Sequence, residues 1–120
     1  MRNCFLQVPY RDRSWQLSIF LHQLHPVLQR QQLDYRIMVV EQSSNEDFNR
    51  AALMNVGYVE TVKNFGHYDC LVFHDVDLLP EDDRNAYTCP SGSRAKHISV
   101  AVDKWKYRCG PNCCHIKGHK

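Results

Sequence analysis

The stretch CLVFHDVDLLPEDDRNAYTC, residues 70–89, joins an apolar run to a dense group of carboxylates. Its residues 71–73 are typical of a buried strand, and Asp75 and Asp77 follow at the carboxyl end of that strand. Because residues two apart in a strand point to the same side, we expect both carboxylates to face one ligand. Two adjacent carboxylates repel each other unless a cation lies near them, and Mg²⁺ and Mn²⁺ prefer oxygen ligands. A solvated acidic turn is the alternative, and this stretch alone does not decide between the two.

Strand and helix patterns alternate on either side of this stretch. Strands are predicted at residues 5–8, 37–40, 70–74 and 97–102, and helices are predicted to begin at Ser14 and near Phe48. Strand, helix, strand, helix, strand predicts an α/β fold with parallel strands. Ligands of such sheets bind beyond the carboxyl ends of the strands, which here are residues 9–13, 41–42 and 75–77.

Several residues are predicted to limit these elements. Pro9 should end the first strand, Pro26 should break or kink the first helix after His25, and Gly57 should end or bend the second helix. Asn45 or Ser44 is expected to cap that second helix. The continuous apolar run at residues 37–40 is typical of a strand covered on both faces. The predicted core face of the first helix consists of apolar residues at helical spacing: Leu17, Phe20, Leu21, Leu24 and Leu28.

Composition excludes several classes of protein. A chain of 120 residues is one domain at most, and 43% hydrophobic residues suffice for a core. A net charge of +2 with mixed signs is not the basic footprint of a nucleic-acid-binding protein. The sequence shows neither a membrane span nor a signal peptide. Six cysteines hint at an oxidising compartment, but their irregular spacing does not describe a full disulfide framework.

Five blocks, in this order, resemble the amino-terminal half of the catalytic domain of the β-1,4-galactosyltransferase family: VPYRDR, HPVLQRQQLDY, FNRAALMNVG, FHDVDLLPEDDRNAY and HISVAVDKW. The resemblance covers roughly residues 8–107. It implies a GT-A fold, of which this chain would hold the amino-terminal half. It also implies inverting, Mn²⁺-dependent transfer of galactose from UDP-galactose to terminal N-acetylglucosamine on glycoproteins or glycolipids, in the Golgi lumen.

The same resemblance implies a set of residues that bind the UDP-sugar donor. They are Pro9, Tyr10, Arg11, Arg13, Phe48, Arg50, Asp75, Val76, Asp77 and Lys104. Within the set, Asp77 would ligate manganese and Phe48 would lie near the uracil. The chemistry agrees, because guanidinium groups suit phosphate oxygens and an aromatic face suits a base. The alternatives are that Arg11 and Arg13 are surface charges and that Phe48 belongs to the core.

Other residues of the acidic stretch receive no ligand role. Glu81, Asp82 and Asp83 are expected to form a solvated turn, and His74 and His97 are expected to be structural. The resemblance implies a disulfide between Cys70 and Cys89, which would indicate a lumenal or extracellular compartment.

The resemblance ends at Tyr107, and this limits the expected activity. The acceptor-binding segment, the general base and the last metal ligand of the family have no match in this sequence, so we assign no catalytic residue and expect an incomplete manganese site. Residues 1–107 are thus expected to form a donor-nucleotide-binding region that is inactive alone. The alternative is a non-catalytic remnant that binds UDP or a partner chain.

Residues 108–120 are expected to form a divergent Cys/His-rich tail without regular structure. Zinc binding by Cys109, Cys113, Cys114, His115 and His119 is the less favoured alternative, because the spacing leaves no hairpin and helix between ligand pairs.

Overall fold

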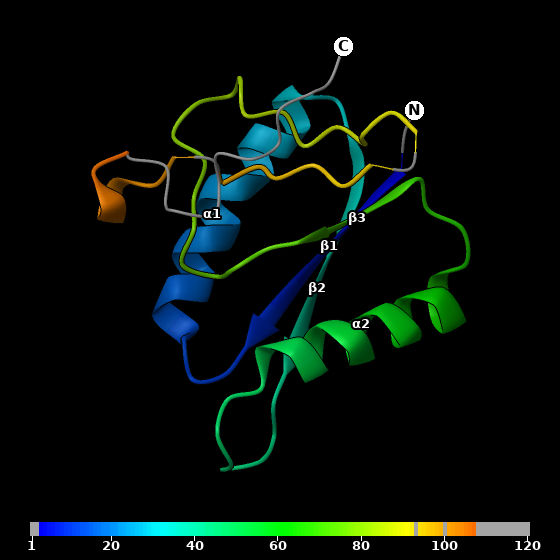
Figure 1. Ribbon diagram of the computed structural model, residues 1–120, viewed down its shortest axis with the longest axis vertical. Coiled ribbons are helices and arrows are strands. Elements are labelled where there is room, and N and C mark those ends of the chain that lie inside the picture. Colours follow the sequence, from blue (N-terminus) through cyan, green and yellow to red (C-terminus); the bar gives the residue numbers. More distant parts are fainter. Residues whose placement is uncertain (1–2, 93, 100, 108–120) are drawn as a thin grey trace.

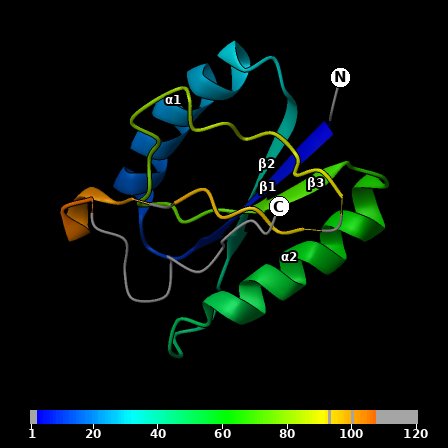
Figure 2. The same ribbon diagram turned by 45° about the horizontal axis from the view of Figure 1, so that its top comes forward.

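The central strand of the protein is β1 (Asn3–Tyr10), and both other strands pair with it in parallel. The computed structural model describes residues 3–92, 94–99 and 101–107. The strands are β1, β2 (Asp34–Glu41) and β3 (Cys70–Phe73), in the sheet order β2-β1-β3. Helix α1 (Ser14–Arg30) covers one face of this sheet and α2 (Arg50–Phe65) covers the other (Figures 1 and 2). The predicted parallel α/β fold is therefore confirmed.

Side chains of β1 alternate between two layers. Cys4, Leu6 and Val8 are completely buried and form the core with α1, while Phe5 and Gln7 point to the α2 side. On that second side the Gln7 Nε2 atom donates a hydrogen bond to Thr61 Oγ1 at 3.0 Å. The period of two along β1 thus divides the protein into a mainly apolar layer under α1 and a partly polar layer under α2.

Helix α1 packs against the sheet through the face that its sequence predicts. Phe20, Leu24 and Leu28 are completely buried, and Leu17 and Leu21 are partly buried. The predicted break at Pro26 is wrong, because the helix continues to Arg30. Pro26 removes one helical hydrogen bond on a face where both His22 and Pro26 are exposed, so water can satisfy the free carbonyl. Burial of Val27 and Leu28 in the last turn stabilises the continuation.

Strand β1 runs beyond its predicted end. Pro9 lies inside the strand, opposite Val40 of β2. Gln7 O accepts a hydrogen bond from the His74 amide, just after β3, and Tyr10 O accepts one from the Gln42 amide, just after β2. Backbone polar groups of successive strand residues point to opposite sides, so the nitrogen of Pro9, like the groups of Gln7, faces β3. Pairing with β3 ends at Gln7, so the missing N–H of Pro9 disrupts no ladder bond.

Helix α2 begins and continues differently from the prediction. Its N-cap is Asn49, whose Oδ1 accepts a hydrogen bond from the Ala52 amide at 3.0 Å, so neither Ser44 nor Asn45 is the cap. Gly57 does not end the helix but lies buried in its middle. A Cβ at Gly57 would lie 2.9 Å from Val40 Cγ2, so the glycine allows the helix to approach the sheet closely.

The outer parts of the sheet are less covered than predicted. Every residue of β2 is half-buried or exposed, and Val39 is 36% exposed, because β2 is an edge strand. The strand expected at residues 97–102 is not formed at residues 97–99 or 101–102. Ile98 instead packs against the core as irregular chain. The last described element is the 3₁₀ turn η1 (Asp103–Trp105).

Two further predictions concern the C-terminal tail and membrane spans. Residues 108–120, with the alternative zinc ligands, lie outside the described residues. Across residues 3–92, 94–99 and 101–107, no helix has the length and apolar character needed to cross a bilayer.

Candidate functional site

Three loops meet at the carboxyl ends of the strands, where the sequence predicts the site. They follow β1, β2 and β3, which all run in the same direction (Figure 1). The first loop contains Asp12 with a φ of 50°, a left-handed conformation that aspartate tolerates better than most residues. A hydrogen bond from the Gln42 amide to Tyr10 O, 3.0 Å long, extends the pairing of β1 and β2 into the first two loops.

Arg11 connects the loop after β1 to the loop after β2. Its Nη1 atom donates hydrogen bonds to the carbonyl oxygens of Ser44, at 3.3 Å, and Glu46. Its guanidinium carbon lies 5.5 Å from the centre of the Phe48 ring. Phe48 is 43% exposed, so it is not the core residue of the alternative interpretation. The structure therefore brings a guanidinium cation and an exposed aromatic ring together.

Gln42 orders the loop between β2 and α2, a role that sequence reasoning missed. Its Nε2 atom donates to Ser44 Oγ and to the carbonyl oxygens of Glu46 and Asp47, at 3.1–3.3 Å. Its Oε1 atom accepts the Asn49 amide at 2.8 Å. The signal in the sequence was the position of Gln42, because residues 41–42 directly follow a predicted parallel strand. The side-chain amide thereby fixes the segment that holds Phe48.

Arg50 forms an ion pair with Asp75 between the start of α2 and the end of β3. The Arg50 Nε atom lies 2.7 Å from Asp75 Oδ1. This pair joins two residues of the predicted donor-binding set that are 25 positions apart. The first carboxylate of the DVD motif is thus oriented by a guanidinium from the neighbouring loop.

The DVD motif lies in a turn and not in the strand. Strand β3 ends at Phe73, and the Leu78 amide donates to Asp75 O at 3.3 Å. The expectation that strand alternation turns Asp75 and Asp77 to the same side is therefore wrong, because alternation applies only to extended backbone. Asp77 is exposed. Among the described residues, no three side chains of metal-ligating type cluster together.

His74 and Tyr87 form a buried polar pair directly before this turn. Tyr87 Oη lies 2.7 Å from His74 Nε2, and His74 Nδ1 lies 2.8 Å from Asp75 O. Since a carbonyl oxygen only accepts, Nδ1 carries the proton and Nε2 accepts from the tyrosine hydroxyl. Burial lowers the pKa of His74 and raises the pKa of Tyr87 to about 12, so both are neutral near pH 7. The pair holds the carbonyl of Asp75 in place.

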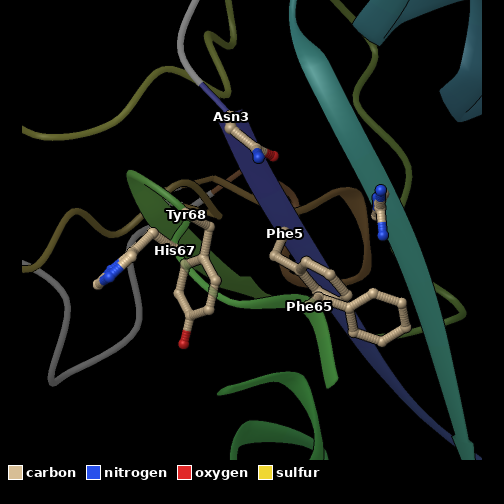
Figure 3. A pocket seen from close by; sticks show the side chains of 6 residues that line it. Asn3, Phe5, Phe65, His67 and Tyr68 are labelled. Carbon is tan, nitrogen blue, oxygen red and sulfur yellow. The ribbon is translucent and has the colours of Figure 1, made fainter. Parts of the chain in front are cut away.

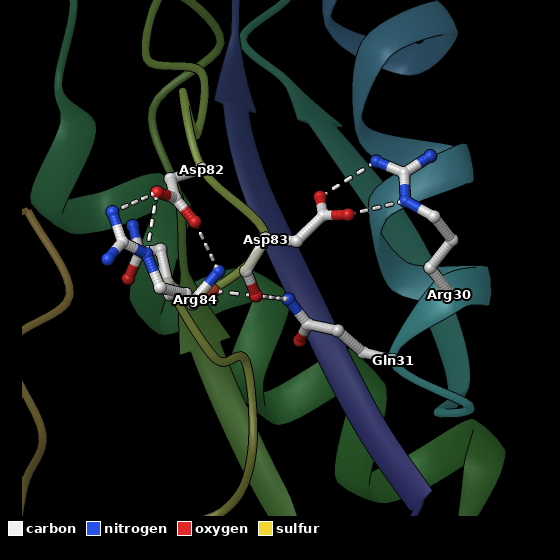
Figure 4. Close-up of polar contacts among 6 residues, drawn as sticks. Arg30, Gln31, Asp82, Asp83 and Arg84 are labelled. Carbon is white, nitrogen blue, oxygen red and sulfur yellow. Dashed lines mark hydrogen bonds and ion pairs between the residues drawn. The ribbon is translucent and has the colours of Figure 1, made fainter.

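The acidic segment after the turn is anchored to the C-terminal end of α1 (Figure 4). Arg30 makes two hydrogen bonds to the Asp83 carboxylate, at 2.6 and 2.7 Å, which lower the pKa of that carboxyl. Gln31 donates to the carbonyls of Asp83 and Asn85 and accepts the Tyr87 amide at 2.9 Å. The segment is exposed, as predicted, but Asp83 also docks it.

Cys70 and Cys89 are joined by a disulfide, as the resemblance implied. Their Cα atoms are 5.4 Å apart, and 19 positions separate them in sequence. The disulfide closes a loop of residues 70–89, which begins at the first residue of β3 and contains the DVD turn. Covalent and polar links thus restrain the turn from both sides.

The remaining predicted site residues occupy different positions. Pro9 is buried and Tyr10 half-buried at the end of β1, Val76 is half-buried in the DVD turn, and Arg13 is exposed directly before α1. Lys104 is exposed in η1, which lies beside α1 and away from the start of α2 in Figures 1 and 2. The described contacts do not bring Lys104 to the other members of the set.

A small hollow lies toward the opposite ends of the strands (Figure 3). Aromatic contacts dominate it: the Phe5 and Phe65 rings are 5.4 Å apart, and the Arg36 guanidinium lies 5.1 Å from the Phe65 ring. Its lining residues are Asn3, Phe5, Arg36, Phe65, His67 and Tyr68. The hollow contains none of the predicted donor-binding residues and is a packing feature of the α2 layer.

Comparison with known proteins defines the class. The family described as the N-terminal region of glycosyl transferase group 7 matches residues 2–90. Mouse β-1,4-galactosyltransferase 1 is 52% identical over 100 residues, which are 83% of this chain and 24% of the mouse protein. β-1,4-Galactosyltransferase 4 of Cricetulus griseus is 50% identical over 101 residues, 84% of this chain and 28% of that protein. The chain therefore belongs to the β-1,4-galactosyltransferase family and corresponds to its N-terminal region.

A solved structure agrees with this assignment. A mutant of Drosophila β-1,4-galactosyltransferase 7, in complex with manganese, UDP-Gal and xylobiose, superimposes with a TM-score of 0.68 at 39% identity. The alignment covers 76% of this chain and 37% of the Drosophila chain. The fold is thus part of a GT-A catalytic domain, as predicted, and the chain spans about a quarter of the length of the curated relatives it matches.

Proposed function

We propose that this chain forms the donor-binding part of a β-1,4-galactosyltransferase, in which the loops after the three strands hold a UDP-sugar. The observation that supports it best is the convergence of Arg11, Phe48, Arg50 and Asp75 from three separate loops. Guanidinium groups bind phosphate oxygens, and an aromatic face can stack on a base. UDP-galactose is the proposed donor, and the Drosophila relative was solved with UDP-Gal.

Individual residues take distinct roles in this proposal. Arg11 uses Nη1 for loop carbonyls, which leaves its other N–H groups for the diphosphate, together with Arg13. Phe48 lies beside the uracil, and Arg50 directs the Asp75 carboxylate toward the donor sugar. Pro9, Tyr10, Val76 and Lys104 complete the proposed donor-binding set.

Manganese fits the type of ligand in the DVD turn but not a complete ligand set. Asp77 offers an exposed carboxylate, and oxygen ligands suit Mn²⁺. The described residues place no three metal-ligating side chains together, so we assign Asp77 as a single protein ligand. Bound there, the cation would supply positive charge to the diphosphate of the donor.

Transfer itself requires more than donor binding. Inverting transfer to an N-acetylglucosamine hydroxyl needs a general base within hydrogen-bond reach of that hydroxyl. The proposal assigns this role to no described residue.

A Golgi lumen location, inferred from the family, agrees with the Cys70–Cys89 disulfide, since disulfides persist in oxidising compartments.

Calorimetric titration of the 120-residue chain with UDP, with and without Mn²⁺, tests the proposal. Arg11→Ala should weaken UDP binding about tenfold or more, because a charge-assisted hydrogen bond contributes about 1.5–3 kcal/mol. Arg84→Ala is the matched control, since Arg84 pairs with Asp82 outside the site. No UDP binding by the unaltered chain, or equal losses in both variants, would refute the proposal.

The metal assignment has its own pair of variants. Asp77→Asn should remove the part of UDP binding that depends on Mn²⁺, and Asp82→Asn, five residues further on, should leave it unchanged. A full Mn²⁺ effect in Asp77→Asn would show that another residue ligates the metal.

A second candidate is a non-catalytic module that binds UDP or a partner chain. It is favoured by apolar side chains exposed on α2 and β3, namely Val56, Val59, Val62 and Phe73. The Mn²⁺ dependence of UDP binding separates the two candidates, because only the donor-binding part uses Asp77 as a metal ligand. UDP binding that Mn²⁺ strengthens supports the donor-binding part, and UDP binding that does not respond to Mn²⁺ supports the module.

A further inference from the structure

Three sulfur atoms from distant parts of the chain meet beside the central strand. Cys4 lies in β1 directly opposite Cys70 of β3 in the parallel register, and Cys70 is bonded to Cys89. The Sγ atoms of Cys4 and Cys70 lie 3.5 Å apart. Cys4 is a free thiol and is completely buried. The fold therefore holds a thiol in contact with a disulfide.

We propose that Cys4, Cys70 and Cys89 form a site of intramolecular thiol–disulfide exchange, in which Cys4 replaces Cys89 as the partner of Cys70. The Cys4 thiolate attacks Cys70 Sγ, a Cys4–Cys70 bond forms, and the Cys70–Cys89 bond breaks. Cys89 leaves as a thiolate and takes up the proton that Cys4 has lost. One thiol and one disulfide are present before and after, so the step consumes no oxidant or reductant.

The sheet already places the two backbones at a suitable separation for the product. Neighbouring strands lie about 4.7–4.9 Å apart, within the range of about 4.4–6.8 Å for the Cα atoms of disulfide-bonded cysteines. Cys4 and Cys70 are direct register partners. Exchange therefore requires side-chain rotation but no change in strand pairing.

The environment of Cys4 makes the exchange slow at neutral pH. Its Sγ donates a weak hydrogen bond to Tyr87 O at 3.8 Å, and burial raises the pKa of Cys4 to about 11. Only the thiolate attacks a disulfide, and its fraction rises about tenfold per pH unit below that pKa. The rate of exchange should follow the same slope.

Exchange would transfer the covalent link from the acidic loop to the sheet. The loop would lose its bond at Cys89, while the contacts of Arg30 and Gln31 with residues 83–87 would remain. The DVD turn would thus change from covalent to purely non-covalent restraint on its C-terminal side. The site provides two alternative states of the same loop.

Peptide mapping of the intact chain tests the proposal directly, because trypsin separates the three cysteines. Cys4 falls in peptide 3–11, Cys70 in 64–84, Cys89 in 85–94, and the three tail cysteines share peptide 109–117. The chain is incubated without denaturant at pH 7–10, quenched with acid, alkylated with N-ethylmaleimide and digested. We expect a cross-link between peptides 3–11 and 64–84, alkylated Cys89, and a rate that rises about tenfold per pH unit. Cys4 alkylated with Cys70–Cys89 intact after incubation at pH 10 would overturn the proposal.

Two variants isolate the partner choice of Cys70. Cys4→Ser is the matched control and should keep the Cys70–Cys89 bond at every pH. Cys89→Ser, oxidised with glutathione disulfide, should form Cys4–Cys70 as its main bond when folded and lose that preference in urea. A Cys70 that instead retains glutathione or pairs with peptide 109–117, or a preference that persists in urea, would contradict a site built by the fold.

Discussion

The buried hydroxyl of Tyr87 offers the sharpest test of how the DVD turn is held. The side chain is 2% exposed, and its hydroxyl donates to His74 Nε2 at 2.7 Å. Its ring is stacked on the His74 ring, with 8° between the planes and 5.7 Å between the centroids. Tyr87→Phe keeps the ring and its packing and removes only the hydroxyl. The substitution therefore perturbs one hydrogen bond.

The cost of this substitution follows from the histidine that is left behind. His74 Nδ1 is committed to Asp75 O, so Nε2 becomes a buried acceptor without a donor. A buried polar atom that loses its partner costs about 1–3 kcal/mol in the free energy of unfolding. With a urea dependence of about 1–3 kcal/mol per molar, a loss of about 2 kcal/mol lowers the unfolding midpoint by roughly 1 M.

Urea unfolding followed by circular dichroism measures the change, with Tyr107→Phe as control. The Tyr107 hydroxyl also makes one hydrogen bond, to Glu81 Oε1 at 2.8 Å, but this side chain is 57% exposed. Water can replace that bond, so no resolvable shift is expected. Equal midpoints for Tyr87→Phe and the unaltered chain would show that the His74–Tyr87 bond does not restrain the turn.

Three further predictions concern stability. Burial lowers the folded-state pKa of His74 below its ordinary value of 6.5, so the unfolded chain binds more protons than the folded chain below about pH 7. The free energy of unfolding should therefore fall by up to about 1.4 kcal/mol per pH unit as the pH drops toward 5. A urea midpoint that does not change over that range would contradict this prediction. Gly57→Ala should lower the free energy of unfolding by up to about 2 kcal/mol, because contact with the Val40 methyl outweighs the gain of about 1 kcal/mol in helix propensity; a higher melting temperature would refute the close approach. Reduction of the Cys70–Cys89 disulfide with dithiothreitol should lower the free energy of unfolding by about 3 kcal/mol for a loop of this length. An unchanged melting temperature in the reductant would show that the loop is ordered without the bond.

Local patterns predicted much of the architecture. The period of Phe20, Leu24 and Leu28 gave the buried face of α1, and the alternation of apolar runs with helical segments indicated parallel pairing. The rule that ligands bind at strand ends then located the three loops in which Arg11 and Asp75 are found. These predictions succeeded because each depends on periodicity within one segment or on the chain direction of parallel strands.

Residues whose role depends on a neighbouring element were predicted less well. Pro26 and Gly57 have intrinsic preferences that end helices, yet burial of the following turn and close contact with the sheet override them. The local pattern predicted that strand alternation extends to Asp75 and Asp77, but β3 ends at Phe73 and the motif turns. Local propensities amount to about 1–3 kcal/mol per residue, which tertiary packing can exceed.

The sequence by itself thus determined the order of the elements from β1 to β3, the α1 core face and, through family resemblance, the disulfide at Cys70. Only the tertiary structure decided which side chains meet: Arg50 with Asp75, Tyr87 with His74, and Cys4 with the disulfide. The partners in these pairs are 25, 13 and 66 positions apart in the chain. No periodicity connects residues at such separations, because their contact arises only when strands and loops pack in three dimensions.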